Sequence, residues 1–311
     1  MTKSVAVLAE ELRQHLGKGF EEHVSLKDVT GTGVGGVADF YFTATTPDEI
    51  IRAITLARQY ELPYAVLGCG SHSLMADYGF AGLVIANHAR RMTFIPGRGQ
   101  VIVESGVVWP ELILAAAGRC LGGLSPLLAL SGTVGGVLAT GIAVPEVSPL
   151  WAVRSVTLLD SDGLIVQKTA RQITKSLKPG VTILTATLQF VQARADQIAF
   201  EVSRYEKTRR GYQASDRRFV GPIFSVAGAS RAFALEDLLN KSPVLGMKNG
   251  NAVFSSQRLN YLEIRGRTNA RELRTLISRV YDELTEETAE TLAVHIKFLG
   301  TWDESGLGSS A

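Results

Sequence analysis

The stretch Leu67–Leu74, which reads Leu-Gly-Cys-Gly-Ser-His-Ser-Leu, decides the fold that we expect for this chain. It continues the apolar run Tyr64–Leu67, which predicts a buried strand, so its glycines lie where the chain leaves a sheet edge. A second stretch, Ser131–Gly136, repeats the pattern as Ser-Gly-Thr-Val-Gly-Gly. Glycine lets backbone N–H groups converge and the hydroxyls add donors, so each loop suits an anion such as a pyrophosphate. One such loop alone is more often a tight turn, and the prediction therefore depends on the pair and its surroundings.

The segments before the first loop predict a β-α-β unit. The glycine-rich stretch Gly31–Asp39 leads into a strand at Phe40–Thr43, and a helix then begins at Pro47. This helix ends near Pro63, and the strand Tyr64–Leu67 follows it. The glycines of the first loop therefore come directly after the second strand of the unit.

The rest of the chain alternates between helical and strand patterns. Helices are predicted at residues 4–16, 109–117, 234–239 and 270–281, and strands at 82–86, 100–104, 182–190, 259–264 and 292–299. Asp160–Gly163 is typical of a hairpin turn. The polar stretch Arg194–Arg218 predicts a helix, then a loop, and a domain boundary.

Composition excludes several classes of protein. The 311 residues carry 32 basic and 30 acidic side chains, a formal charge of +2, which gives no electrostatic case for nucleic acid or an acidic membrane. Cys69 and Cys120 form no disulfide framework and have no metal-ligand spacing around them. The chain shows neither a secretory signal nor an apolar run of about twenty residues, so we expect a cytoplasmic protein with no metal.

Four motifs in a fixed order carry a resemblance to a known family. They are Gly33–Ala38, Leu67–Ser71, Gly79–Ile85 and Ser131–Gly136. In this order and spacing the chain resembles the UDP-N-acetylenolpyruvylglucosamine reductase family, the MurB type, from about residue 24 to residue 300. That family consists of FAD flavoproteins with the p-cresol methylhydroxylase/vanillyl-alcohol oxidase fold.

The resemblance implies an α+β fold, with a two-part FAD-binding domain and a smaller C-terminal α+β substrate domain. It implies FAD-binding subdomains at residues 1–85 and 86–195, with residues 296–303 returning to the first. The substrate-type domain is then expected at residues 196–295, and a disordered tail at 304–311.

The resemblance also implies where FAD binds. The first loop should meet the pyrophosphate, while the second should lie along the flavin and its ribityl-diphosphate, and the loop around Gly141 should lie near the cofactor. The residues concerned are Gly68, Cys69, Gly70, Ser71, His72 and Ser73, then Ser131, Thr133, Gly135 and Gly136. The flavin would supply the chemistry and the protein its position.

The residues that the family uses for catalysis differ in this chain. The family places a proton-donating serine where this chain has Pro222, and proline has neither a hydroxyl nor a backbone N–H. The family's C-terminal glutamate is matched by His295. Its arginine has no clear counterpart; Lys175 or Arg171 could approximate the charge, although a point cation such as the Lys175 ammonium does not reproduce a guanidinium fork. Enolpyruvyl reduction by the family mechanism is therefore not expected.

Three residues keep two interpretations each. His295 is either a buried structural histidine or a catalytic group. His72 takes the place of a family asparagine. Related flavin oxidases bind the flavin covalently through a nearby histidine, which is one interpretation. The register of His72 differs from theirs by one residue, which favours the other interpretation, a hydrogen bond to phosphate or flavin. Cys69 is either a small buried residue, the favoured interpretation, or a thiolate beside the anion-binding loop.

Candidate substrate residues lie in and after the polar stretch. Arg209, Arg210 and Tyr212, together with Arg217 and Arg218, form either a polar loop or a set of anion-binding groups. Asn260 matches an asparagine of a family segment that contacts the nucleotide.

The sequence therefore predicts an FAD-dependent oxidoreductase that acts on a different small molecule, anionic or nucleotide-like, with NAD(P)H as a candidate electron donor. Two alternatives stay open. One is a flavin-binding scaffold or sensor without turnover, and the other is the family's own reductase with a different proton donor.

Overall fold

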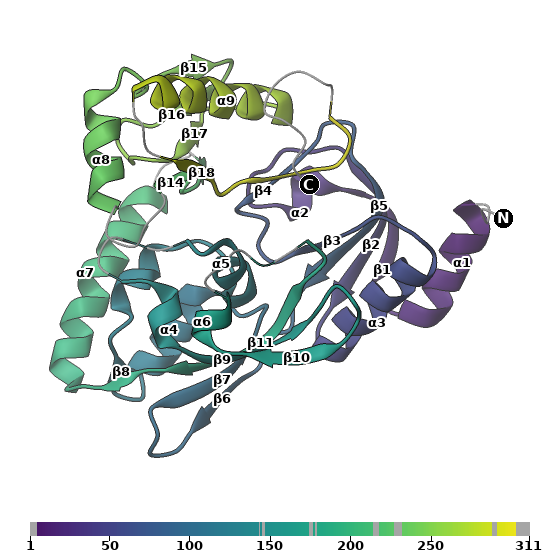
Figure 1. Ribbon diagram of the computed structural model, residues 1–311, viewed down its shortest axis with the longest axis horizontal. Helices are drawn as coiled ribbons and strands as arrows, with labels where there is room; N and C mark the ends of the chain where they lie inside the picture. Colours follow the sequence, from purple (N-terminus) through teal and green to yellow (C-terminus); the bar gives the residue numbers. More distant parts are fainter. Residues whose placement is uncertain are drawn as a thin grey trace.

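The computed structural model describes residues 5–142, 144, 147–173, 177, 179–213, 218–226, 232–287 and 291–302. The tail 304–311, Lys175 and Arg217 lie outside these ranges, so the predictions made for them stay predictions. Figure 1 shows three parts: the N-terminal lobe in purple, the second lobe in blue to teal, and a C-terminal unit in green and yellow above them. Within the described ranges, no helix is long and apolar enough to cross a membrane.

The first lobe is built on a four-stranded sheet with the order β1-β2-β5-β3. Its strands are β1 (Phe20–Ser25), β2 (Val37–Ala44), β3 (Tyr64–Leu67) and β5 (Phe80–Asn87). β5 is parallel to β2 and β3 and is almost entirely buried, because both faces of this central strand are covered. Its helices are α1 (Val5–Leu16), α2 (Leu26–Val29) and α3 (Pro47–Gln59). Thr46 caps α3 by accepting a hydrogen bond from the Glu49 N–H at 3.3 Å.

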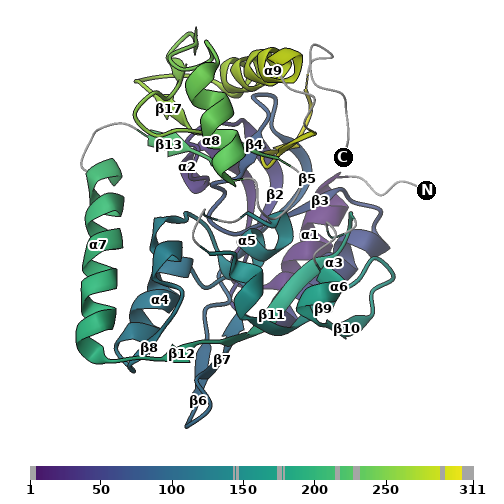
Figure 2. The same cartoon turned by 60° about the vertical axis from the view of Figure 1, so that its left-hand side comes forward.

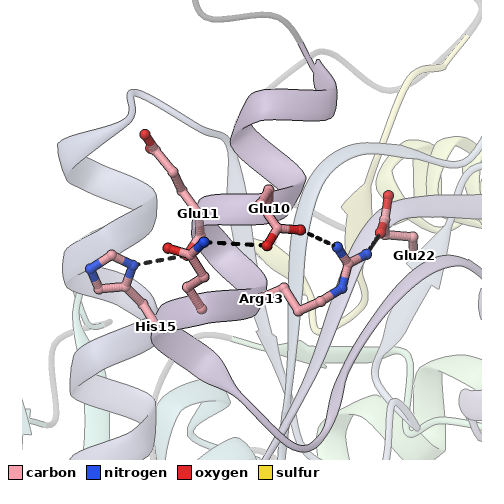
Figure 3. Close-up of polar contacts among 6 residues, drawn as sticks. Glu10, Glu11, Arg13, His15 and Glu22 are labelled. Atoms are coloured by element: carbon pink, nitrogen blue, oxygen red, sulfur yellow. Dashed lines mark hydrogen bonds and ion pairs between the residues drawn. The ribbon is translucent and has the colours of Figure 1, made fainter.

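The outer face of α1 carries a network of exposed polar contacts where the helix meets β1. Figure 3 shows Arg13 between Glu10, at 2.8 Å, and Glu22 on β1. Exposed ion pairs of this kind contribute little to stability, so the buried face of the helix, with Leu12 and Leu16, holds α1 in place.

The second lobe is a five-stranded antiparallel sheet with the order β10-β9-β11-β7-β6. Its strands are β6 (Met92–Ile95), β7 (Gln100–Glu104), β9 (Val153–Leu159), β10 (Ile165–Lys168) and β11 (Thr182–Gln189). The short strands β8 (Leu121–Gly122) and β12 (Val191–Gln192) pair beside it. Its helices are α4 (Trp109–Ala117), α5 (Val134–Thr140) and α6 (Ala170–Ile173), with 3₁₀ turns η1 (Ser125–Ala129) and η2 (Pro149–Ala152). Trp109 is fully buried in the core between these helices and the sheet.

Helix α7 (Ala195–Gln213) links the second lobe to the C-terminal unit and runs along one edge of the molecule (Figures 1 and 2). Val202 and Tyr205 pack against the core of the second lobe, and the helix contacts η1 and α4. The boundary predicted at residue 195 precedes this helix, whereas by its packing α7 extends the second lobe. Composition marked the change to a polar stretch, but it could not show which core the few apolar side chains of α7 would join.

The C-terminal unit combines a four-stranded sheet, a two-stranded sheet and two helices. The sheet order is β13-β17-β16-β15, made of β13 (Arg218–Val220), β15 (Lys248–Asn249), β16 (Ala252–Phe254) and β17 (Leu262–Ile264). β14 (Phe224–Val226) pairs with β18 (Leu292–Val294). The helices are α8 (Ala232–Lys241) and α9 (Ala270–Glu287), and α9 buries residues at helical spacing from Leu273 to Leu284. The two-part body with this smaller α+β unit confirms the predicted fold class.

The prediction of one strand over residues 292–299 is wrong. The chain forms β18 in the C-terminal unit, breaks at His295 and Ile296, and then forms β19 (Lys297–Leu299). β19 pairs in parallel with β4 (Ser73–Met75) of the first lobe, directly after the Gly68–His72 loop. The apolar pattern is continuous across both segments, so it could not show that the chain changes sheets between them.

Two further boundaries differ from the prediction. The strand predicted at 259–264 begins only at Leu262, because Asn260 has a positive φ of 65°. The second glycine stretch is a loop only as far as Thr133, where α5 begins with the Thr133 hydroxyl accepting a hydrogen bond from the Gly136 N–H.

Candidate functional site

The fold brings the two glycine loops into direct contact. The first loop, Gly68–His72, connects β3 to β4, and the second, Ser131–Thr133, leads into α5. A Cβ atom added at Gly68 would lie 2.4 Å from the Thr133 Oγ1 atom, which is too close for any side chain. Gly132 in turn lies near the Ser71 hydroxyl. Residues 61 and 65 positions apart in the chain thus form one surface, as the pairing of the two motifs led us to expect.

A third glycine-rich segment, Thr30–Gly36, completes this surface. The Gly31 N–H donates a hydrogen bond to the Cys69 carbonyl at 3.0 Å. From the C-terminal unit, the Arg218 guanidinium donates to the carbonyls of Thr32 and Gly33 at 3.5 and 3.3 Å. Loops from both lobes and an arginine of the third part therefore meet at one place.

The two loops differ in the backbone donors that they can offer to a diphosphate. The N–H groups of Val134 and Gly135 already donate to the carbonyls of Val107 and Ser105, at 2.7 and 2.8 Å. Among the contacts of the described residues, by contrast, none occupies the N–H groups of residues 69–72. Convergent unpaired N–H groups are the donor set that a buried phosphate requires, so the first loop fits the diphosphate of FAD.

Gly135 has a packing role in the structure, and its place along the flavin stays a prediction. A Cβ atom at this position would lie 2.7 Å from the Ser105 Cβ atom, so glycine is needed for α5 to pack against the end of β7. Ser131 is exposed beside the first loop, and its place along the cofactor stays a prediction.

His72 lies at the end of the first loop. Its carbonyl accepts a hydrogen bond from the Lys297 N–H at 3.0 Å, and its Nδ1 atom lies 3.1 Å from the Ser71 hydroxyl. Burial, and to a smaller extent His295 and Arg258, lower the pKa of His72 to about 4, while a hydrogen bond between the ring and the Gly221 backbone acts in the opposite direction. The ring is therefore neutral at pH 7.

His295 stands next to His72, although the two are far apart in sequence. Its backbone N–H donates to the Ile223 carbonyl at 2.7 Å, which ties it to the segment containing Pro222. Burial lowers the pKa of His295, and a hydrogen bond with the Thr140 backbone partly opposes this shift. Thr140 directly precedes Gly141, so the loop around Gly141 reaches the same place as the two histidines.

Two of the predicted substrate residues have their described ion pairs away from this place. Arg209 and Arg210 lie on α7 and form ion pairs with Glu206 of the same helix, at 3.7 and 3.2 Å. Within the described contacts, none joins these arginines to either histidine, and the side chain of Tyr212 lies outside the described part.

Asn260 has a structural role in the same region. Its side-chain oxygen accepts hydrogen bonds from the N–H groups of Ile223 and Phe224, at 3.2 and 2.8 Å, and its side-chain amide donates to the Phe224 carbonyl at 2.8 Å. This side chain fixes the backbone that follows Pro222. A direct contact of Asn260 with substrate stays a prediction.

Sequence analysis missed Arg258. Its guanidinium lies 3.6 Å from the centre of the Tyr261 ring, and its Nη2 atom donates to the Ala129 carbonyl at 3.3 Å. Its positive charge is the smallest of the contributions that lower the pKa of His72. Its position two residues before Asn260, in a segment already singled out, was the available signal.

Cys69 is half-buried, and burial raises the pKa of its thiol, with Arg90 acting in the opposite direction. The raised pKa favours the interpretation of Cys69 as a packed thiol over that of a thiolate, which stays a prediction. In the part of the chain that the structure describes, no group of three His, Cys, Asp or Glu residues could hold a metal ion.

Comparisons with known proteins agree with this geometry. Residues 38–168 match the model of the FAD binding domain family. The UDP-N-acetylenolpyruvoylglucosamine reductase of Geobacter metallireducens is 29% identical over 95% of this chain and 97% of its own length. The reductase of the same name from Moorella thermoacetica is 27% identical over 95% and 98%. The crystal structure of UDP-N-acetylenolpyruvylglucosamine reductase (MurB) from Thermus caldophilus superimposes with a TM-score of 0.69 at 25% identity, covering 89% of this chain and 98% of that one.

The FAD-binding domain match, the relatives aligned over nearly the whole length and the similar solved structure agree with one another. They support a flavoprotein of the MurB type with the p-cresol methylhydroxylase/vanillyl-alcohol oxidase fold.

Proposed function

We propose that this FAD-binding oxidoreductase applies the MurB-type cofactor cleft to a small substrate other than the enolpyruvyl nucleotide. One observation carries the proposal: Pro222, at the position where the resemblance implies a proton-donating serine, lies in the segment that contacts His295. Proline offers no proton, so we assign the handling of a proton to the two imidazoles. This set differs from the hydroxyl and carboxylate that the family's reaction requires.

The cleft supports distinct roles for its residues. When bound, FAD would accept and deliver the hydride, with NAD(P)H as a candidate donor. The N–H groups of residues 69–72 would hold its diphosphate, and Asn260 keeps the segment after Pro222 in place. His72 and His295, neutral and partly buried, would bind or relay a proton at the substrate. The cations Arg218 and Arg258 favour an anionic substrate, such as a carboxylate or a nucleotide.

A direct assay tests the proposal. The FAD-loaded protein is mixed with NADPH, with and without the enolpyruvyl nucleotide, and the absorbance of NADPH and of the flavin is followed. We expect flavin reduction by a reduced nicotinamide and no steady NADPH consumption that depends on the enolpyruvyl nucleotide. Steady, substrate-dependent consumption at rates typical of enzymes, about 1–1000 per second, contradicts the proposal.

The second candidate is the family's own reaction with a different proton donor. The names of the relatives, which align over nearly the whole chain, favour it. The same assay separates the two, because only this candidate consumes NADPH in proportion to the enolpyruvyl nucleotide. A protein that binds FAD but is reduced by neither NADH nor NADPH would instead indicate a scaffold or sensor.

A further inference from the structure

We propose that Arg218, a side chain of the C-terminal unit, binds the diphosphate of FAD next to the first glycine loop. In the proposed function Arg218 is only a positive charge that favours an anionic substrate, whereas here it contacts the cofactor itself. This role would appear in the affinity for FAD, without any turnover.

A tight turn at residues 30–33 receives the Arg218 guanidinium. Thr32 is fully buried, its hydroxyl lies 3.1 Å from the Thr30 hydroxyl, and the Gly33 N–H donates to the Thr30 carbonyl at 3.1 Å. A Cβ atom added at Gly33 would fall on the Arg218 Nη1 atom, so glycine leaves the space that the guanidinium occupies. The Nη1 atom donates to the carbonyls of Thr32 and Gly33 at 3.5 and 3.3 Å. The position of the Arg218 side chain is therefore set by a turn whose backbone is fixed.

The same turn packs against the first glycine loop. The Gly31 N–H donates to the Cys69 carbonyl at 3.0 Å, and a Cβ atom added at Gly31 would lie 3.4 Å from the Ser71 Cα atom. Both contacts involve a residue without a side chain, so the two backbones lie close together. The turn that holds Arg218 therefore also contacts the loop whose N–H groups, those of residues 69–72, are available to a diphosphate.

The glycine segments themselves supply hydrogen-bond donors but no cation. Residues 30–36, 67–74 and 131–136 contain neither lysine nor arginine. His72, in the second of these segments, is neutral at pH 7, because burial lowers its pKa to about 4. A charge-assisted hydrogen bond from a guanidinium to a phosphate is about twice as strong as a neutral one, so a cation here adds more than a further N–H group would. The described contacts of Arg218 bring such a cation to the turn.

The Arg218 guanidinium has further donors that can bind a ligand. Both of its described hydrogen bonds start from Nη1, and at 3.3 and 3.5 Å they exceed the usual N–H···O range of about 2.7–3.2 Å. Within the described contacts, no acceptor occupies the Nε or Nη2 groups of Arg218. The five N–H donors of a guanidinium lie in a planar fork that matches the oxygens of a phosphate. Arg218 can therefore bind a phosphate without leaving the turn.

Titration of the FAD-free protein with FAD, followed by quenching of the flavin fluorescence, tests the assignment. Arg218→Gln should weaken FAD binding by about tenfold or more, because a charge-assisted hydrogen bond to phosphate is lost. Riboflavin, which has the flavin ring but no phosphate, should bind the variant and the wild type with equal affinity. Arg267→Gln, the same change at an exposed arginine of the same unit, should leave both affinities unchanged.

A second change addresses the space at Gly33. In Gly33→Ala the methyl group would fall on the Nη1 atom, and the guanidinium, at the end of a flexible side chain, would move away from the turn. The φ of 65° at Gly33 strains an alanine in any background, so the change is also made in the Arg218→Gln protein. We expect Gly33→Ala to weaken FAD binding by about threefold or more beyond its effect in that protein, which has no guanidinium to displace.

Stability without the cofactor separates binding from a structural contact between the two parts. The urea midpoint of FAD-free Arg218→Gln should equal that of the wild type, because the side chain is exposed and its hydrogen bonds are long. The proposal is overturned if Arg218→Gln binds FAD as well as the wild type, which would leave the arginine to the substrate, or if it loses affinity for FAD and riboflavin by the same factor. An equal effect of Gly33→Ala in both backgrounds overturns it as well. Should Gly33→Ala fail to fold, the Arg218→Gln titrations decide alone.

These results are independent of the assay for the proposed function. Consumption of NADPH with the enolpyruvyl nucleotide would contradict the proposed function and leave the assignment of Arg218 standing. Unchanged FAD affinity in Arg218→Gln would do the reverse.

Discussion

At the scale of single residues, the contact between Gly68 and Thr133 keeps the two glycine loops together. Sequence patterns marked both loops as anion-binding turns of the same kind. In the structure the two loops differ. The N–H groups of Val134 and Gly135, at the end of the second loop, donate to carbonyls of the protein, whereas those of residues 69–72 in the first loop stay available for a ligand. Glycine therefore has two uses here. It allows close packing at Gly68 and Gly135, and in the first loop it leaves backbone N–H donors exposed.

Gly68→Ala should separate the loops. The added methyl group would lie 2.4 Å from the Thr133 Oγ1 atom, so we expect a loss of about 1–3 kcal/mol in stability together with weaker FAD binding. Fluorescence quenching of FAD and chemical denaturation measure the two effects. Gly118→Ala is the control, since a Cβ atom added there would lie 3.7 Å from the Leu114 carbonyl oxygen and the φ of Gly118 is −61°. Equal behaviour of the two variants would show that the contact does not matter.

The burial of neutral His72 should make the protein sensitive to acid. The folded ring has a pKa of about 4, below the ordinary value of 6.5, so between these pH values the unfolded chain binds a proton that the folded chain does not. Stability contributed by this residue is present above pH 6.5 and is lost as the pH falls towards 4, by at most about 3 kcal/mol.

Urea unfolding of the FAD-free protein at pH 7.5 and pH 5.0 measures this loss. His72→Asn should lose less stability than the wild type between the two pH values, while His15→Asn, on the exposed face of α1, should follow the wild type. If His72→Asn follows the wild type as well, the ring is not held neutral in the folded protein.

At the scale of elements, the start of α9 joins two parts of the molecule. The Asp77 carboxylate, which follows β4 of the first lobe, accepts hydrogen bonds from the N–H groups of Ala270 and Arg271 at 2.8 and 2.9 Å. Within the helix, Asn269 accepts from the Glu272 N–H at 2.8 Å. A carboxylate is favourable at this end of a helix because the first N–H groups have no partner inside it.

Asp77→Ala should leave two of these N–H groups unpaired. We expect a loss of about 1–2 kcal/mol, with faster hydrogen exchange confined to residues 270–275. Denaturation and hydrogen exchange read by mass spectrometry provide the measurements, and Asp162→Ala, at the exposed turn between β9 and β10, is the matched control. Faster exchange spread over the whole C-terminal unit would mean that Asp77 stabilises more than the start of this helix.

At the scale of the whole molecule, the candidate cofactor site depends on all three parts. The loops come from the two lobes, while Arg218, Asn260 and His295 come from the C-terminal unit or its return to β4. The apolar cores also join, since Leu74 of β4 packs within the core of the C-terminal unit. A ligand held at this junction should therefore stabilise the molecule as one body.

FAD should raise the midpoint of thermal unfolding in a single transition. At a concentration one hundred times its dissociation constant, the gain is about 2.7 kcal/mol, because FAD binds only the folded state. Differential scanning calorimetry of the protein with and without FAD measures it, and free riboflavin, which lacks the diphosphate, serves as the control. If riboflavin raised the midpoint of thermal unfolding by as much as FAD, residues 69–72 would not stabilise the protein by binding the diphosphate.

The sequence by itself determined the fold class, the family and the two glycine loops, because these depend on local patterns. The run Tyr64–Leu67 followed by glycines is a short-range signal, and so is the helix that begins at Pro47. Only the tertiary structure decided that His72 and His295 stand together, that Arg258 reaches Ala129, and that Asn260 holds the segment after Pro222. The resemblance implied that residues 296–303 return to the first lobe, and the structure decided which strands the two halves of segment 292–299 pair with. The physical reason is the same in each case: these contacts join residues far apart in the chain, and no periodicity of apolar side chains specifies which distant partner a strand or a polar group will meet.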